Sequence, residues 1–413
     1  MYRSLFNLPQ LAGLANVEDC FDSRAWSVEQ SVGQWKRLHY CLRELCQMMT
    51  ARINSEPIYE MKLIYSHHCY LIAEQVTSIR KRVSEMREPP LGLDKVPHPG
   101  LERLILDCGR CNERMAFLVS AYEVILPAVS LACHQITLQA HPIADAPSIR
   151  TARLIEFELT EVVQVGQSAI AALRSAQLEN PNANDLERGS IDLDQWRSHL
   201  QACLQASGGI DGCSVIDETA SKVAAIPEPF TFPVAFQYSS TPKRDSRFRD
   251  SYNAGVNAEA FLYDERFSAQ DKTLMMYYKR LREIDVPEAM ASILCELDHR
   301  PWDFYREMYR QLWDEARHAM MGEIGFASQG IDWTQIPINF TWSLNLNSQL
   351  TPQERHGVLF FIEQGLMTRT GKRYEWEIAR SIVTIGCQHC FRISIGPMKC
   401  FTLKLVTLVR EAV

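Results

Sequence analysis

The most informative stretch of this chain is Pro301–Glu323, PWDFYREMYRQLWDEARHAMMGE. Pro301 suits the first turn of a helix, and no helix-breaking residue follows before Gly322. Glu315 lies on a stripe at helical spacing that is otherwise apolar: Met308, Leu312, Glu315, Ala319 and Gly322. Because an unpaired buried charge is costly, Glu315 needs a cation beside it. His318 follows three residues later, so both side chains point the same way and can bind one metal ion together.

The motif Asp314-Glu315-Ala316-Arg317-His318 resembles the D-E-x-R-H helix of the ferritin-like di-iron carboxylate superfamily, especially its rubrerythrin-type branches. The resemblance covers roughly residues 258 to 380 and is weaker outside this motif. That architecture uses one Glu from each of two helices and Glu-x-x-His from each of the other two. The resemblance implies a di-iron or iron/manganese cofactor and oxidase or hydroxylase chemistry. It also implies that Asp314 orients a histidine of a neighbouring helix. A chance Glu-x-x-His pair on an exposed helix is the alternative interpretation.

A second helix is predicted from Thr351 to about Met367. Its start, Thr351-Pro352-Gln353-Glu354, is a capping-box signature with proline in the first turn. The apolar stripe of this helix holds one carboxylate, Glu363, which is a candidate metal ligand. His356, on the same side two turns earlier, is interpreted as an ordinary surface or core histidine.

Two carboxylates compete for the ligand position on the preceding helix. A turn near His299 would place Glu283 opposite Glu315, because both lie 16 residues from it. Helical periodicity favours Glu288 instead, which shares a stripe with apolar neighbours. Asp285-Val286-Pro287-Glu288 also fits a capping box, which would explain Glu288 without a metal. Both Glu283 and Glu288 therefore remain candidates.

The first half of the chain is predicted to form four long helices, at about residues 30–53, 59–86, 101–138 and 148–173, with a kink at Pro127. Short connections indicate an antiparallel bundle within residues 1–206. Residues 207–257 are rich in Gly, Pro and polar residues, which predicts an extended linker or wrapping segment. The predicted fold class is therefore all-α: an N-terminal helical bundle and, over residues 258–413, a ferritin-like antiparallel four-helix bundle.

The tail, residues 381–413, departs from this helical texture. Its sequence, SIVTIGCQHCFRISIGPMKCFTLKLVTLVREAV, is cysteine-rich and β-prone, and it lacks the second Glu-x-x-His pair. Reading each codon one base earlier makes Met398-Lys399 encode Glu, and permitted third bases yield Asp-Glu-Val-Leu-His. The tail is therefore interpreted as frameshifted. The last helix is expected to be lost or irregular, and the di-metal site to be incomplete.

Composition and charge narrow the classes of function. The 413-residue chain has a formal net charge of -7, which argues against nucleic-acid binding, because phosphates require a basic surface. No signal peptide and no membrane-spanning run of about 20 apolar residues is expected. Thirteen scattered cysteines fit a reducing cytoplasm. The expected partners are a small-molecule substrate or oxygen, and a homodimer is a candidate oligomeric state.

Two functions of different class follow from these patterns. The first is a ferritin-like di-metal protein of oxidoreductase ancestry that activates oxygen or peroxide and is impaired in this copy. Its ligands would come from Glu315, His318, Glu363 and either Glu283 or Glu288. The alternative is a non-catalytic helical interaction or scaffold protein without bound metal.

Overall fold

A computed structural model describes residues 5–22, 26–87, 92–179, 189–213, 225–248, 258–336, 338, 341–362 and 377–378. Over these residues the predicted all-α class is confirmed, since they form helices and no strand, apart from an isolated bridge between Cys111 and Ala235. Two compact units are present: residues 1–46 with 71–237, and residues 47–70 with 238–413. Residues 47–70 thus belong to the second unit although they lie early in the sequence.

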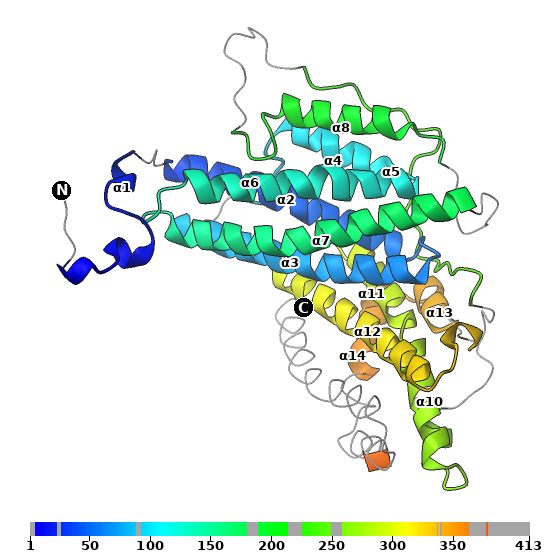
Figure 1. Ribbon diagram of the computed structural model, residues 1–413. Coiled ribbons are helices and arrows are strands. Elements are labelled where there is room, and N and C mark those ends of the chain that lie inside the picture. Colours follow the sequence, from blue (N-terminus) through cyan, green and yellow to red (C-terminus); the bar gives the residue numbers. More distant parts are fainter. Residues whose placement is uncertain are drawn as a thin grey trace. The chain divides into compact units, whose positions relative to one another are not determined.

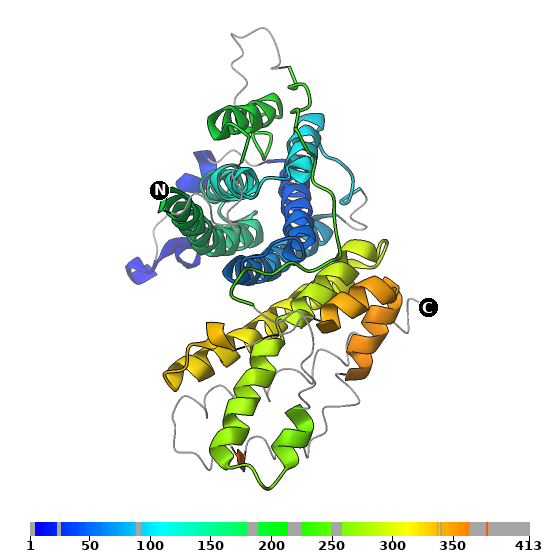
Figure 2. The same cartoon turned by 90° about the vertical axis from the view of Figure 1, so that its right-hand side faces the viewer.

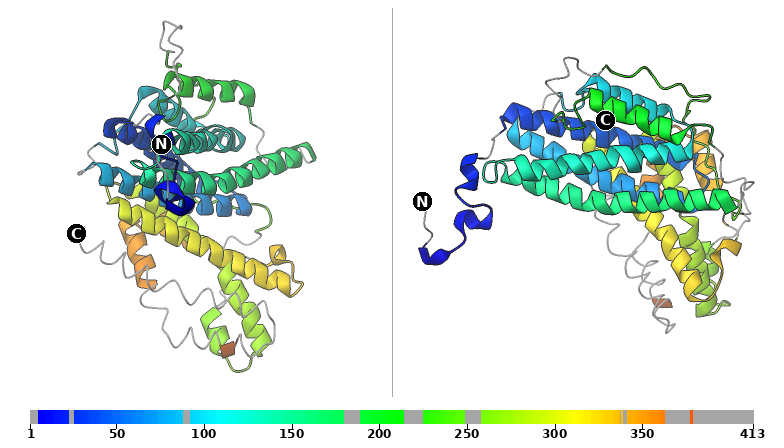
Figure 3. Two further views of the ribbon diagram at one scale, coloured as in Figure 1. Left: turned by 60° about the vertical axis from the view of Figure 1, so that its left-hand side comes forward. Right: turned by 45° about the horizontal axis from the view of Figure 1, so that its top comes forward.

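The first unit contains the helices labelled α1 to α8 in Figure 1, of which α1 and α8 lie outside the four helices that the hydrophobic pattern predicts. They are α1 (Asp19–Asp22), α2 (Val28–Ile53), α3 (Tyr59–Met86), α4 (Pro99–Arg110), α5 (Arg114–Val119), α6 (Leu126–Gln139), α7 (Ala146–Glu179) and α8 (Leu193–Ala206), with short 3₁₀ turns at Leu5–Asn7 and Gln10–Gly13. Helices α2 and α3 continue into the second unit. Helices α6 and α7 pack along each other (Figure 3). The buried Trp196 donates a hydrogen bond from Nε1 to the Ala116 carbonyl at 2.9 Å, which fixes α8 on α5.

The helix predicted over residues 101–138 is interrupted. It ends at Arg110, where Cys111 takes an extended conformation, and helix α5 begins at Arg114. Residues Ser120–Ile125 then form a π-helical segment, and Pro127 lies in the first turn of α6. Proline has no N–H to donate to the preceding turn, so α-helical hydrogen bonding is interrupted near it.

The stretch Arg114–Gln139 contradicts the expectation that the chain has no apolar run long enough to span a membrane. Among the described helices, this stretch alone is long and apolar enough to cross a membrane, whereas no such run was expected. Of its most apolar window, 72% is buried inside the protein. Burial of this kind is what the core helix of a folded domain shows.

The second unit contains the helices around the candidate site. They are α9 (Ala258–Tyr263), α10 (Ala269–Arg282), α11 (Asp285–Glu296), α12 (Trp302–Ser328), α13 (Thr341–Gln349) and α14 (Pro352–Phe361), with a 3₁₀ turn at Trp333–Gln335. The helix predicted after Pro301 is confirmed as α12, and it continues through Gly322. The capping box between Thr351 and Glu354 is confirmed at the start of α14.

Small residues on α12 allow α10 to approach it closely (Figure 2). A Cβ atom added to Gly322 would lie 2.4 Å from the backbone nitrogen of Leu281, and one added to Gly325 would lie 2.3 Å from the Tyr277 ring. Only glycine can occupy such close contacts between helices without displacing them. The last turn of α10 is therefore held directly against α12.

Candidate metal centre

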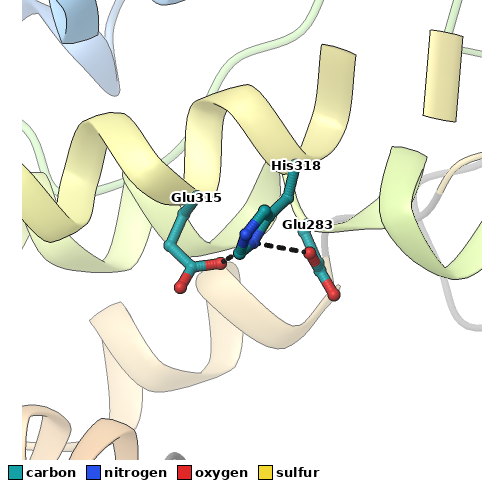
Figure 4. A group of neighbouring side chains, drawn as sticks. All are labelled: Glu283, Glu315 and His318. Carbon is teal, nitrogen blue, oxygen red and sulfur yellow. Dashed lines mark hydrogen bonds and ion pairs between the residues drawn. The ribbon is translucent and has the colours of Figure 1, made fainter. Parts of the chain in front are cut away.

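Three side chains of the second unit converge: Glu283, Glu315 and His318 (Figure 4). One ligand atom from each lies within 4.8 Å of the other two. Nδ1 of His318 lies 3.0 Å from Oε2 of Glu283 and 3.1 Å from Oε2 of Glu315. The side chains of His318 and Glu315 are only 4% and 5% exposed, and that of Glu283 is 18% exposed. This is a largely buried cluster of two carboxylates and one imidazole.

Local sequence explains how each side chain reaches the cluster. Glu315 and His318 are three residues apart on α12, so they project from the same face. Glu283 follows the last residue of α10, and α11 begins two residues later at Asp285. Pro287 lies in the first turn of α11 and cannot donate the backbone hydrogen bond that a continuous helix would need. Glu283 therefore lies at a helix break that faces α12.

Arg280 completes the immediate surroundings of Glu283. Its Nη1 atom donates to Oε1 of Glu283 at 2.7 Å and to Oε2 at 2.9 Å. The Arg280 side chain is 8% exposed. Arg280 is not among the predicted site residues, although its three-residue spacing from Glu283 on a helix is the signal of an ion pair.

Burial and charge act in opposite directions on the titratable groups of the cluster. Burial alone would raise the pKa of Glu283, but the charges of Arg280 and His318 outweigh it and lower this pKa to about 2. Burial alone would lower the pKa of His318, but Glu315 and Glu283 raise it to about 9. Without a metal, the imidazole at neutral pH is therefore protonated and bridges the two carboxylates.

The donor set fits one divalent metal ion. Two carboxylates and one imidazole suit iron, manganese or zinc, and they leave coordination positions for other ligands. A metal would have to displace the proton on His318, because a metal-binding imidazole nitrogen must be unprotonated. A complete two-metal site of the predicted type needs roughly four carboxylates and two histidines. The described part of the chain brings together about half of that set.

Glu288, the other candidate of its helix, is placed differently. Its side chain is fully buried, 2.5 Å from Nζ of Lys62 and 2.9 Å from Nη2 of Arg244. Ser343 donates a hydrogen bond to it at 2.8 Å. The positive charges of Lys62 and Arg244 therefore compensate the negative charge of Glu288.

The capping box predicted from Asp285 to Glu288 is wrong. Helix α11 starts at Asp285, its N-cap is Ile284, and no side chain caps it. The Asp285 carboxylate instead pairs with Arg244 at 2.5 Å. The carboxylates of the predicted capping box therefore pair with cations that are distant in the sequence, such as Lys62, which donates to Glu288.

The other residues that the sequence patterns single out are two candidate site residues, Asp314 and Glu363, the tail, and His356, which is expected to be an ordinary surface or core histidine. Asp314 is mostly buried and pairs with Arg317 of the same helix. Glu363 and the tail 381–413 lie outside the described residues. His356 is a core histidine whose ring centroid lies 5.4 Å from that of Phe304.

His356 gives a prediction for the pH dependence of stability. Burial, followed by the charge of Arg300, lowers the pKa of His356 to about 4. A histidine whose pKa is lowered on folding stabilises the native state above its ordinary pKa, about 6.5, and loses that contribution as the pH falls through the folded value. The H356Q variant should therefore lose about 2–3 kcal/mol less of its free energy of unfolding than the original protein between pH 7 and pH 4. Urea titrations at both pH values measure this, and an equal loss in the two proteins would contradict it.

Known proteins give no independent assignment. Comparison of the chain with protein-family models, with curated proteins and with solved structures finds no match in any of the three.

Proposed function

We propose that this chain is a metal-binding protein of ferritin-like, oxidoreductase ancestry, in which Glu283, Glu315 and His318 hold a divalent iron or manganese ion. The convergence of these three side chains from α12 and the break between α10 and α11 supports the proposal. The sequence also supports it, because Glu315 interrupts an apolar stripe of the predicted helix and His318 follows three residues later. Such an ion supplies redox chemistry when bound, while the chain binds it, fixes its position and limits its contact with water.

The frameshift interpretation of residues 381–413 belongs to the same proposal. The ligands that a two-metal site would still need are a further carboxylate, for which Glu363 is the candidate, and a second Glu-x-x-His pair. In the proposed ancestral frame, that pair is encoded within the tail. We therefore propose that oxygen or peroxide activation is weak or absent in this copy, and that metal binding is the property that remains.

The protonated state of His318 supports a second candidate function. An imidazolium between two carboxylates neutralises much of their charge, so these ion pairs can stabilise the cluster without a metal. A helical scaffold or interaction protein without bound metal would use this cluster only for stability. Metal analysis separates the two functions.

The test is metal binding by the full-length protein. We expect the unsubstituted protein, loaded anaerobically with Fe²⁺ or Mn²⁺ and then desalted, to retain metal. The E315Q/H318Q variant should lose at least about 90% of it, because two of three ligands are removed. Glu265 is exposed in the same unit, so E265Q is the matched control and should retain the original metal content. Absence of metal from the unsubstituted protein would favour the scaffold, and equal retention by all three proteins would place the metal elsewhere.

A further inference from the structure

We infer that the candidate centre holds a single metal ion, because the guanidinium of Arg280 acts as its second cation. The inference rests on the proposed function and differs from the two-metal site that the sequence predicts. The contact that carries it is the pair of hydrogen bonds, at 2.7 and 2.9 Å, from Arg280 to the two oxygens of Glu283.

Charge balance favours one metal ion over two. The described centre has two carboxylates, and one divalent ion already neutralises them. Arginine stays protonated at all accessible pH values, so the guanidinium of Arg280 keeps its positive charge beside Glu283. A second divalent ion at this carboxylate would lie next to that charge, within a largely buried region where like charges repel strongly.

The geometry of Glu283 points the same way. A carboxylate that bridges two metal ions presents one oxygen to each of them. Here both oxygens accept from Arg280, and Oε2 also faces Nδ1 of His318 at 3.0 Å. Glu283 can therefore offer Oε2 to a metal held by His318, while Oε1 remains with the guanidinium. This is the arrangement of a terminal ligand.

Arg280 is held in this position. It lies on α10 three residues before Glu283, and its side chain is almost fully buried. On the same helix, Tyr277 and Leu281 are buried, and their backbone atoms lie close to Gly322 of α12. The guanidinium therefore cannot simply swing into solvent when a metal approaches.

The other candidate carboxylate of this region provides independent support. Glu288 is neutralised by Lys62 and Arg244 rather than left available to a metal. Both carboxylates that the sequence offered for the helices before α12 are thus paired with protein cations. A centre with one metal ion and a fixed guanidinium is consistent with both observations.

The test compares Mn²⁺ binding by the full-length protein and its R280M and R280K variants, using isothermal titration calorimetry and the electron paramagnetic resonance signal of free Mn²⁺. We expect the unsubstituted protein to bind about one ion per chain. R280M should bind its first ion at least about tenfold more tightly, since a repelling charge is removed. R280K retains the charge and should remain within about threefold of the original affinity.

Each outcome decides between the alternatives. Two ions bound by the unsubstituted protein, or R280M binding that is no tighter, would overturn the role of Arg280 while leaving the proposed metal function intact. No Mn²⁺ bound by any of the three proteins would reject both. A purely structural role for Arg280 predicts weaker binding in both variants. If R280M does not fold, the neutral variant R280Q takes its place in the same comparison.

Discussion

The R244M substitution is expected to lower the free energy of unfolding of the full-length protein by about 3–5 kcal/mol, because it removes one partner from a buried ion network. The Arg244 side chain is 3% exposed and contacts Asp285 at 2.5 Å and Glu288 at 2.9 Å. Its loss would leave two buried carboxylates for which, among the residues that the structure describes, Lys62 is the remaining cationic partner in an ion pair. Methionine fills a similar volume, so the cost measures the lost charge more than a cavity.

Two opposing effects set the pKa of Asp285 in this network. Burial raises the pKa of Asp285 to about 7, against the opposing attraction of Arg244. Without Arg244, this carboxyl would be protonated at higher pH still, which offsets part of the cost. The destabilisation by R244M should therefore be larger at pH 8 than at pH 5, because only the ionised carboxylate needs the guanidinium.

Arg266 is the matched control. It pairs with Asp264 at the same distance, 2.5 Å, but its side chain is 85% exposed. Exposed ion pairs contribute little because water and salt screen them. Urea denaturation followed by circular dichroism should show no measurable change for R266M. Equal effects of R244M and R266M would mean that burial does not set the importance of these pairs.

The features of the fold that the sequence predicts correctly are those that local geometry determines. Helix α12 and the shared face of Glu315 and His318 follow from helical spacing alone. The capping box at Thr351 also depends on residues within one turn. In each case the interacting groups are close in sequence, so no knowledge of tertiary packing is needed.

The features that the sequence does not predict depend on distant residues or on burial. A capping box forms at Thr351, but the similar sequence at Asp285 forms none. The Asp285 carboxylate instead accepts a hydrogen bond from Arg244, which lies 41 residues away in the sequence. Lys62, which pairs with Glu288, is 226 residues away. The spacing of Arg280 and Glu283 predicts an ion pair, yet only the structure shows that this pair lies beside His318.

The position of Glu283 is an intermediate case. Counting residues back from a turn near His299 indicates that Glu283 lies opposite Glu315, and the structure brings the two into one cluster. Counting assumes a continuous helix, however, whereas the chain breaks between α10 and α11. Pro287 is the local signal for this break, since it lies in the first turn of the second helix.

The second large effect is expected at Gly322, where the contact between α10 and α12 positions Glu283. An added Cβ atom would lie 2.4 Å from the nitrogen and 2.8 Å from the Cα of Leu281, and 2.7 Å from the Tyr277 carbonyl oxygen. These are backbone atoms, so no rotamer change can relieve the contact. The G322A variant must move the two helices apart, at a cost of roughly 1–3 kcal/mol or more in stability.

The same displacement should reach the candidate metal centre. Arg280 and Glu283 lie at the end of α10, next to this contact, whereas Glu315 and His318 lie on α12. Separation of the helices lengthens the distances between the two ligand groups, and metal binding depends on those distances. If the proposed function holds, G322A should therefore weaken Mn²⁺ binding by at least about tenfold, even at temperatures where the variant remains folded.

Gly357 provides the matched control, because it is exposed on α14 and a Cβ atom added there would contact nothing within 4 Å. Alanine is favoured over glycine in a helix by about 0.5–1 kcal/mol, so G357A should be slightly stabilising and should leave Mn²⁺ affinity unchanged. Thermal unfolding and Mn²⁺ titration of both variants test the pair of predictions. If G322A matched G357A in melting temperature, the close contact would not exist in solution. If G322A were destabilised yet bound Mn²⁺ normally, the ligands would not depend on how closely α10 packs against α12.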